Sequence, residues 1–323
     1  MAEWLVEEGI GEDRAVLLDG DHIIAARIRA KGAMAAGQVA EARLVSRTKG
    51  SARGIARLAG REVLVDRLPQ SASEGAPIRL EIVRPALAEQ GRLKRAQARP
   101  TDSEPRAAPT LAQVLVAEGR EVRTVSRFPA CGWDDLLAEA FAAEIEFAGG
   151  TLLFSPTPAM LLVDIDGMLP PRQLALAAVP ALASALHRFD IGGSIGIDFP
   201  TLQGKADRKA VDEALAGALA DWPHERTAIN GFGFVQLVAR LERPSLLHLA
   251  TYDRAGTAWR MLLRRAEMLE GAGDIELTIN PALRAQAEPD VFLELRRRTG
   301  RSAHLREDPT LAIEAPQAQL VPR

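Results

Sequence analysis

The stretch TLLFSPTPAMLLVDIDG, residues 151–167, decides how the second half of this chain folds. It holds two short apolar runs, TLLFS and AMLLVDID, separated by a Pro- and Thr-rich break, which is typical of two buried strands joined by a turn. Downstream, strand-like and helix-like runs continue to alternate, and this alternation predicts an α/β layer. The expected elements are a helix around 173–187, a strand at SIGIDF (194–199), a helix around 207–220, and strands at TAIN (227–230) and FGFVQLVA (232–239).

The first hundred residues are expected to be rich in strands. Residues 4–30 alternate apolar and polar side chains with period two and contain Gly- and Asp-rich turns, so they read as two or three strands. From residue 37 to 99, short alternating runs separated by Gly, Ser and Pro fit a small β-barrel of the oligonucleotide-binding kind. The run AQARPTDSEPRAAPT (96–110) is rich in Pro, Ser and charge, so it reads as a linker that contains a domain boundary.

The remaining elements are predicted from local patterns. Short strands are expected at 113–116 and 122–126, an amphipathic helix at 133–147 ended by Gly149-Gly150, a helix at 257–270, a strand at IELTIN (275–280), a helix at 282–299, and a last strand or two through Leu311. The final Leu320-Val321-Pro322-Arg323 has the form of a thrombin-type cleavage remnant. We therefore leave it out of the fold assignment.

Composition narrows the class of protein. Of 323 residues, 47% are hydrophobic, which is enough for two or three compact domains. No apolar run approaches the ~18 residues of a membrane span, and the start MAEWLVEEGIGEDR is acidic, so we expect a soluble, cytoplasmic protein with no membrane partner. Cys131 is the single cysteine, and the five histidines show no ligand spacing, so neither a disulfide nor a structural zinc site is expected.

Positive charge is concentrated in one segment. The formal net charge is −3, yet residues 41–99 carry 13 Lys and Arg against 6 Asp and Glu, an excess of seven. A basic module inside an acidic protein suggests a surface that binds a polyanion. An arginine-rich surface that is merely solvated remains the alternative.

Three aspartates occupy corresponding places near the ends of two apolar runs. Asp164 and Asp166 are two residues apart in LLVDID, so on an extended segment both carboxylates project from one face, and Asp198 ends SIGID. Carboxylates brought together on neighbouring strands repel one another unless a cation or a proton compensates, and hard oxygen ligands select Mg²⁺, with Mn²⁺ as a possible substitute. Such a metal could activate water against a phosphodiester. Aspartate at a strand end also caps a following helix, and that alternative stays open.

Several longer motifs resemble those of the ribonuclease E/G family. GGTLLFSPTPAMLLVDIDG (149–167) is similar to the family's GG-x-LVI-x-PTEALT-x-IDVN, and HRFDIGGSIGIDF (187–199) to its LRLRDLGG-x-IVIDF. KAVDEAL follows at the family's distance, INGFGFVQLVARLERPSL (229–246) parallels IS-x-FGLLEMSRQR-x-x-PSL, and the tail to Leu311 resembles the pattern after the family's zinc linker. The resemblance covers residues 129–314.

The resemblance implies an architecture and a set of metal ligands. The fold expected is α/β (α+β): a ribonuclease-H-like domain with an inserted S1/OB-like β-barrel, then a DNase-I-like α/β metal-binding layer and a small C-terminal α/β segment. Carried over by position, Asp164 and Asp198 become the magnesium-binding carboxylates, and Asp166 stands where the family has an asparagine. The expected boundaries are 1–36 for the N-terminal strands, 37–99 for the barrel, 100–110 for the linker, 111–150 for the rest of the first domain with a reduced 5′-sensor region, 151–250 for the catalytic subdomain, 251–319 for the C-terminal segment and 320–323 for the vector remnant.

The chain departs from the family in several places. Ala175 and Ala177 stand where the family has polar residues, so polar support of the site could be lost. The zinc linker expected after Leu246 is replaced by LHLATYDRAG, so this would be a short, zinc-linker-less member, a monomer or a dimer without a zinc bridge. Arg123-Thr124 matches the family's 5′-sensor pair only by coincidence, and Gly231 replaces the arginine that would complete the sensor pocket.

The barrel segment is poor in aromatic residues where the family stacks bases. It offers a set of basic side chains instead, so binding to RNA is expected to be sequence-tolerant and salt-sensitive. The candidate RNA-binding residues are Arg47, Lys49, Arg53, Arg57, Arg61 and Arg67.

Three functions are weighed. The leading one is an endoribonuclease that cleaves single-stranded RNA with Mg²⁺ held by Asp164, Asp166 and Asp198 as the catalytic residues. The second is an RNA-binding relative with lost or reduced catalysis, and the third is a metal-dependent phosphohydrolase of a small molecule. Steep salt dependence of binding to an unstructured oligonucleotide would separate the first two from the third.

Overall fold

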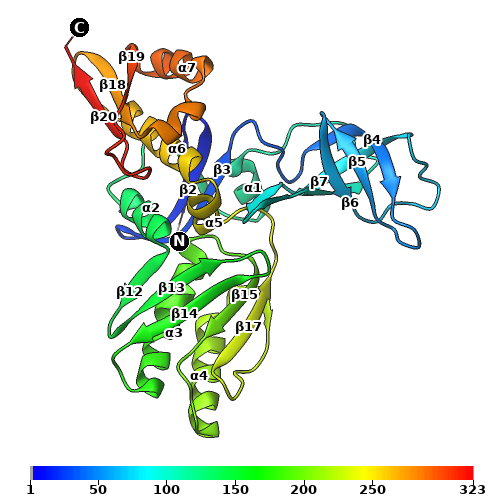
Figure 1. The fold of residues 1–323 in the computed structure, drawn as a ribbon, viewed down its shortest axis with the longest axis vertical. Coiled ribbons are helices and arrows are strands. Elements are labelled where there is room, and N and C mark those ends of the chain that lie inside the picture. The colour runs from blue at the N-terminus through cyan, green and yellow to red at the C-terminus, as the bar shows by residue number, and fades with distance from the viewer. Residues whose placement is uncertain (1–2, 323) are drawn as a thin grey trace.

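The computed structural model describes residues 3–322 and shows a mixed α/β protein with one closed barrel and several sheets (Figure 1). Met1, Ala2 and Arg323, the last of which belongs to the tail set aside above, lie outside the described residues. The barrel stands out from the body as an arm, the largest sheet forms the lower part in this view, and the C-terminal segment forms the upper part (Figure 1).

The N-terminal sheet has the order β11-β1-β2-β3. Its strands are β1 (Trp4–Glu8), β2 (Glu12–Asp19), β3 (His22–Ala30) and β11 (Val122–Val125). The first three are antiparallel neighbours, as expected for residues 4–30, and β11 adds parallel to β1. The strand expected near 122–126 is therefore confirmed and belongs to this sheet.

The segment 111–117 is a helix, and the strand expected at 113–116 is wrong. In α1 (Leu111–Ala117), the Gln113 N–H donates to Thr110 Oγ1 at 3.2 Å and the Thr110 N–H donates to Gln113 Oε1 at 2.8 Å. This capping box satisfies two N–H groups that a helix start leaves free. Leu111 and Leu115, four residues apart, are buried against β1 and β2. A four-residue window was too short to show this helical spacing.

The inserted segment is a closed five-stranded barrel, in the order β10-β6-β5-β4-β7. Its strands are β4 (Val39–Arg47), β5 (Gly54–Leu58), β6 (Arg61–Val65), β7 (Pro77–Arg84) and β10 (Ala96–Pro100). Alternate residues of the strands fill the interior, among them Leu44, Val63 and Leu80. A two-stranded hairpin, β8 (Leu87–Glu89) and β9 (Arg92–Lys94), precedes the last strand.

The last barrel strand ends at Pro100, close to the predicted barrel boundary at 99, so within the run 96–110 the first five residues are strand and not linker. Residues 96–100 form β10, which pairs with β6 and β7 and closes the barrel. Ala96 and Ala98 point inward and are fully buried, so their side chains are as apolar as a barrel interior requires. Gln97 and Arg99 alternate with these alanines and form the outer face of the strand. Two alanines among polar residues are a weak period-two pattern, so the sequence did not indicate a strand here.

The six-stranded sheet has the order β12-β13-β14-β15-β17-β16. Its strands are β12 (Glu144–Phe147), β13 (Gly150–Pro156), β14 (Leu161–Gly167), β15 (Gly193–Asp198), β16 (His224–Arg226) and β17 (Phe234–Ala239). The helices α3 (Pro171–Arg188) and α4 (Lys205–Ala218) connect its strands. In Figure 1 both helices lie behind the sheet. The predicted α/β layer is confirmed, with the last strand before β17 at 224–226 rather than at TAIN (227–230).

The helix expected at 133–147 is shorter than predicted. α2 (Trp133–Ala142) ends at Ala143, which has a left-handed backbone with φ 55°, and residues 144–147 then form strand β12 against β13. EIEF (144–147) alternates polar and apolar residues, so its apolar residues fit the spacing of an amphipathic helix as well as the period of two of a strand. Gly149 therefore belongs to a hairpin turn, and the six-stranded layer begins at residue 144 instead of 151.

The C-terminal segment packs helices on a three-stranded sheet of order β19-β18-β20. Its elements are α5 (Leu246–Tyr252), α6 (Arg254–Glu267), β18 (Asp274–Ile279), a 3₁₀ helix η1 (Pro281–Gln286), α7 (Pro289–Thr299), β19 (Ala303–Glu307) and β20 (Gln317–Val321). The single helix expected at 282–299 is two, because Pro289 lacks an N–H and starts a new helix at its first turn.

The tail set aside above takes part in the fold. Leu320 pairs with Ile275 and Val321 with Asp274 in strand β20, antiparallel to β18. Leaving Leu320 and Val321 out of the fold was therefore wrong, because both residues belong to the strand that completes this sheet.

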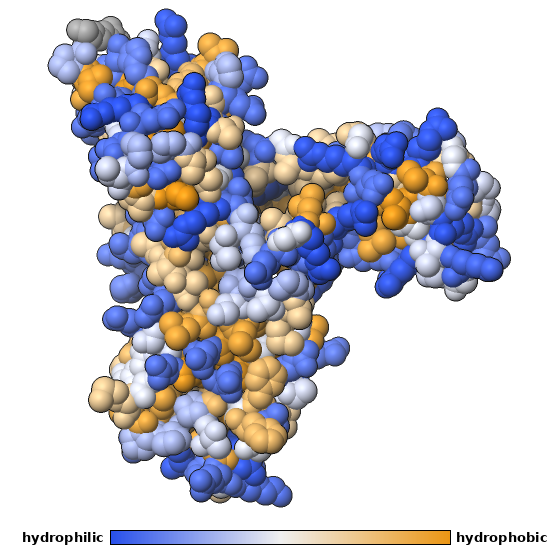
Figure 2. Space-filling model, viewed as in Figure 1, coloured by the Kyte–Doolittle hydropathy of each residue, from blue (hydrophilic) through white to orange (hydrophobic). Residues whose placement is uncertain are grey.

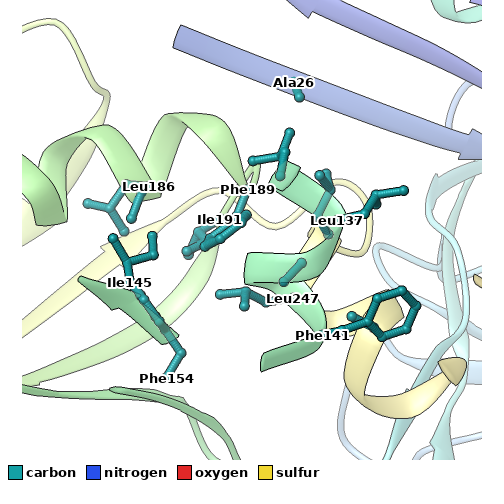
Figure 3. Packing of buried hydrophobic residues seen from close by; sticks show 14 of the residues in the cluster. Ala26, Leu137, Phe141, Ile145, Phe154, Leu186, Phe189, Ile191 and Leu247 are labelled. Atoms are coloured by element: carbon teal, nitrogen blue, oxygen red, sulfur yellow. The ribbon is translucent and has the colours of Figure 1, made fainter. Parts of the chain in front are cut away.

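The main core joins these layers. Ala26 of the N-terminal sheet, Leu137 and Phe141 of α2, Phe189 after α3 and Leu247 of α5 meet in one buried cluster (Figure 3). Phe154 and Phe189 contact edge to face, with ring centroids 5.9 Å apart. The sheet that carries the aspartates is thus fixed to the rest of the body. Among residues 3–322 no helix is long and apolar enough to cross a membrane.

Candidate active site

Asp164 and Asp198 are direct neighbours in the sheet. β14 and β15 are parallel, and their register pairs Asp164 with Asp198. Adjacent strands lie about 4.8 Å apart, and directly opposed residues point to the same face. The structure therefore brings together the two carboxylates that the sequence identified.

The aspartates lie on the face of the sheet that α3 and α4 leave open. In β14, Val163 and Ile165 are buried toward the helices, and Asp164 and Asp166 are exposed on the other side. In β15, Ile197 is buried and Asp198 is exposed. In Figure 2 this open face is turned to the viewer in the lower half of the molecule, where polar residues lie among apolar ones.

Two rows of this open face can be read from the strand register. One row runs Glu144, Leu153, Asp164, Asp198, Phe234, and the next runs Glu146, Thr151, Asp166. These rows carry five carboxylates and no lysine or arginine. A phosphodiester approaching this face would be repelled unless a cation lay between them.

Asp166 differs from the other two aspartates in its surroundings. Its Oδ1 accepts a hydrogen bond of 2.8 Å from the Gly167 N–H. Gly167 packs against Gly150 and Leu174, so a side chain there would clash with both. One oxygen of Asp166 is thus engaged by its own backbone, and the carboxylate is held at the end of β14.

The aspartates have the donor chemistry of a magnesium site. In the part of the chain that the structure describes, Asp164 and Asp198 have neither an ion pair nor a hydrogen-bond donor within reach of their carboxylates, so both stay available as ligands. Within residues 3–322, no group of three or more His, Cys, Asp or Glu side chains is arranged to hold a metal ion. Mg²⁺ needs fewer protein ligands, because it commonly keeps several waters and binds one or two carboxylates together with substrate phosphate.

Apolar side chains border Asp198. The Phe234 ring lies over Gly196, two residues before Asp198, and a methyl group at Gly196 would come within 2.6 Å of the ring and 2.9 Å of Met160 Sδ. Gly196 therefore provides the space into which Phe234 folds. The site is a carboxylate pair with an apolar wall on one side.

The two alanines expected to weaken polar support of the site lie on α3, on the other side of the sheet. Ala175 is completely buried between α3 and the sheet, and Ala177 is half-buried on the same helix. Both belong to the side of the sheet opposite the open face. The expected loss of polar support at these two positions does not concern the immediate surroundings of the aspartates.

The basic barrel residues form two separate groups. One group lies where the chain passes from β4 to β5 and where it continues beyond the end of β6: Arg47, Lys49, Arg53 and Arg67. The two segments are joined there, because the Leu68 N–H donates to the Ala52 carbonyl at 2.8 Å. Arg57 and Arg61 lie at the opposite end of β5, beside the turn at 59–60. The single patch implied by the sequence is therefore two patches.

Some of these basic residues already have protein partners. Arg47 Nη1 donates to the carbonyls of Gln70 and Ala72, and Arg53 Nε lies 2.9 Å from Asp66 Oδ1. Lys49 and Arg67 are exposed in the same group. Within this group, Lys49 and Arg67 are therefore better placed to meet an anion than Arg47 and Arg53.

The segment in which the resemblance places a reduced 5′-sensor region forms α1 and β11. Arg123 is on the edge strand β11, where its Nε lies 2.9 Å from Glu3 Oε2. Gly231 has open space around its α-carbon, so no neighbouring side chain fills the place of the family's arginine. This arrangement favours the interpretation that the Arg123-Thr124 match is coincidental.

A cavity of about 640 Å³ lies at the base of the barrel arm. It is lined by β7, α1, α5 and the hairpin β8–β9, and it contains none of the three aspartates or the six candidate RNA-binding residues. His248 borders it, and burial lowers the pKa of this imidazole, while a backbone hydrogen bond with Ala88 partly opposes the shift. The carboxylates instead lie on an open surface outside this cavity.

Phe232 was not among the residues predicted for the site. It is 83% exposed in the turn before β17. Phe232 stands in INGFGF between Asn and Gly residues, and an aromatic residue in such a turn indicates exposure.

No family model matches this chain, and no match is found among curated proteins.

Proposed function

We propose that this protein is a Mg²⁺-dependent endoribonuclease that cleaves single-stranded RNA at the Asp164–Asp198 pair. The observation that carries the proposal is the register of β14 and β15, which places these two aspartates side by side on an open face. The resemblance to the ribonuclease E/G family supports the same two residues as the metal ligands.

Asp164 and Asp198 would hold the metal ion, and Asp166 would stay beside them through its bond to Gly167. When bound, Mg²⁺ supplies charge neutralisation for the phosphodiester and a water of lowered pKa. The carboxylates fix where that charge sits, and the apolar wall at Phe234 limits access of bulk water from one side. The remaining acidic residues of the face repel phosphates that approach away from the metal.

An extended strand of RNA fits this surface better than a small phosphorylated molecule. The carboxylate pair lies on an open strand face and not in the cavity at the base of the arm, and the barrel arm carries exposed cations for the backbone. Binding through backbone charge is expected to be salt-dependent and tolerant of sequence. A barrel that merely has an arginine-rich surface is the alternative, and it predicts no salt dependence from these residues.

The first prediction concerns the aspartate pair. Asp164→Asn and Asp198→Asn should each lower cleavage of a labelled, unstructured RNA by at least about a thousandfold, or ~4 kcal/mol of transition-state binding, because each removes a ligand charge at nearly constant size. RNA affinity and melting temperature should change little.

The control is Asp290→Asn, an exposed aspartate on α7, which should cleave as the unaltered protein does. Full activity in either site variant would remove the assignment. RNA that is bound but not cut by the unaltered protein with Mg²⁺ would favour the RNA-binding function without catalysis.

A further inference from the structure

Phe232 is an aromatic side chain left in solvent at the edge of the candidate site. Among the described residues, it is the only aromatic one in the set of exposed large hydrophobic side chains, at 83% exposure. The chain is poor in aromatic residues, 4% overall, and the others pack into cores or against neighbours. Packing therefore does not explain its exposure at this edge of the sheet.

The strand register places the turn that carries Phe232 beside the end of β15, where Asp198 lies. Phe234, two residues later, is the cross-strand partner of Asp198. The Phe199 N–H donates to the Gly233 carbonyl at 3.1 Å, which ties the turn of Phe232 to the end of β15. Met168, fully exposed, follows the end of β14 at the same edge of the sheet. Exposed apolar side chains thus flank the carboxylates on the β14 and β17 sides.

The turn that carries Phe232 is held by Asn230. Asn230 Oδ1 accepts from the N–H groups of Phe232 at 2.9 Å and Phe234 at 3.1 Å, and the Asn230 carbonyl accepts from the Gly233 N–H at 3.1 Å. Gly233 has φ 92°, and a side chain there would clash with the Phe199 carbonyl. The ring is presented by a braced turn, so ordering it on a ligand costs little entropy.

We infer that Phe232 is a base-stacking platform, on which a nucleobase beside the scissile phosphate lies while that phosphate meets the Asp164–Asp198 pair. The inference rests on the proposed function and names a subsite of the same site. Stacking on an aromatic face is available to every base, so Phe232 would position single-stranded RNA without selecting its sequence. A base locked in a duplex could not reach the ring, which restricts cleavage to unpaired segments.

The test is a coupling experiment between Phe232 and one base. Phe232→Ala is combined with a series of single-stranded RNAs in which one nucleotide near the cut is replaced by an abasic residue. Phe232→Ala should lower kcat/KM on intact RNA about tenfold, and an abasic residue at the stacking position should do the same for the unaltered protein. The two changes together should cost no more than either alone, because both remove one contact.

Further variants separate stacking from apolar bulk. Phe232→Leu should lower kcat/KM as much as Phe232→Ala does, because leucine has bulk but no aromatic face. Phe232→Trp should keep kcat/KM near that of the unaltered protein. Leu293→Ala, which removes a 65% exposed side chain on α7, should have no effect. Equal activity of Phe232→Ala and the unaltered protein, or additive losses at every abasic position, would overturn the inference and leave the proposed nuclease intact.

A second measurement is independent of cleavage. In Phe232→Trp, the additional emission relative to the unaltered protein should be quenched by a single-stranded RNA and not by a wholly abasic strand of equal length. If the unaltered protein does not cut RNA, the proposed nuclease fails, and this quenching alone decides whether the platform exists. Equal quenching by both strands would exclude stacking.

Discussion

At the scale of single residues, the three aspartates on one face are not equivalent. Asp164 and Asp198 are opposed on neighbouring strands, and their carboxylates have no hydrogen-bond or ion-pair partner among the described residues. In Asp166, one carboxylate oxygen accepts a hydrogen bond from the Gly167 N–H. A group bonded to its own backbone has less freedom to rearrange around a cation. In the proposed site, Asp164 and Asp198 would therefore bind the metal ion directly, and Asp166 would act on it only through its charge.

The corresponding prediction is that Asp166→Asn is tolerated. The amide oxygen of asparagine can accept the same bond from Gly167, and the face loses one repelling charge, so cleavage should fall by about tenfold at most, the lower end of what outer partners of a metal site cost. Titrating Mg²⁺ should show a higher concentration for half-maximal activity, because one attractive charge is gone. A loss equal to that of Asp164→Asn would make Asp166 a direct ligand.

At the scale of elements, the barrel strands separate the basic residues of one continuous segment into two groups. The residues from 47 to 67 are continuous in sequence, but Arg53 directly precedes β5 and Arg57 lies near its other end, beside the turn to β6. Arg57 also faces Glu62 across the strands, which reduces its local charge. The two ends can therefore be tested separately.

The barrel prediction compares two matched double variants. Lys49→Gln with Arg67→Gln should weaken binding to unstructured RNA evenly across sequences, and should reduce the slope of log K against log salt by about 1.4, or ~0.7 for each lost phosphate contact. Arg57→Gln with Arg61→Gln removes the same charge from the other end and should change the slope less. The measurement is binding at several salt concentrations. Unchanged slopes in both variants would place the RNA elsewhere.

At the scale of the whole molecule, a buried charge network joins the N-terminal sheet to α6. Arg14 is completely buried and lies 2.8 Å from Glu7 Oε1 and 2.7 Å from Glu12 Oε1. Arg264 of α6 lies 2.8 Å from Glu7, and Arg260 lies 2.9 Å from Glu12. The two carboxylates are thus shared between β1, β2 and α6, so the first and last parts of the chain depend on each other.

This network predicts a loss of stability in acid. Burial raises the pKa of Glu7, but the hydrogen bond and charge of Arg264, with Arg14 and the Phe128 N–H, outweigh burial and lower it below its usual 4.5. A carboxyl whose pKa is lowered on folding stabilises the fold above the unfolded pKa, and this contribution is lost as pH falls through the lower, folded value. The free energy of unfolding should therefore decline below about pH 4.5.

Glu7→Gln tests this. The glutamine has no charge to offset the buried guanidinium groups, so among the described residues Arg14 keeps only its ion pair with Glu12, and Arg264 keeps only that with Asp134 at 3.7 Å. Breaking a buried ion pair in this way costs about 3–5 kcal/mol. Denaturant unfolding at pH 7 should show that loss, and its decline toward acid should be shallower than for the unaltered protein. Glu3→Gln, at an exposed ion pair with Arg123, is the control and should cost less than about 1 kcal/mol. Equal stability of Glu7→Gln and the unaltered protein would contradict the role given to the network.

The sequence by itself determined the α/β layer, the barrel segment and the two aspartates, because each rests on a local period. Strands at 150–156, 161–167 and 193–198 were readable since buried strands are short apolar runs between turn residues. Asp164 and Asp198 stood at equivalent places in such runs. Their position near strand ends was therefore visible without knowing the fold.

Tertiary structure decided what local patterns leave open. EIEF at 144–147 and AQARP at 96–100 became strands because a neighbouring strand accepted their backbone bonds, and Leu320 and Val321 joined β18 for the same reason. Pairing between residues far apart in sequence also set the register that opposes Asp164 to Asp198, divided the arginines between two ends of the barrel, and brought Phe232 to the aspartates. Such pairing depends on backbone groups common to every residue, so the side-chain pattern of one segment does not specify its partner.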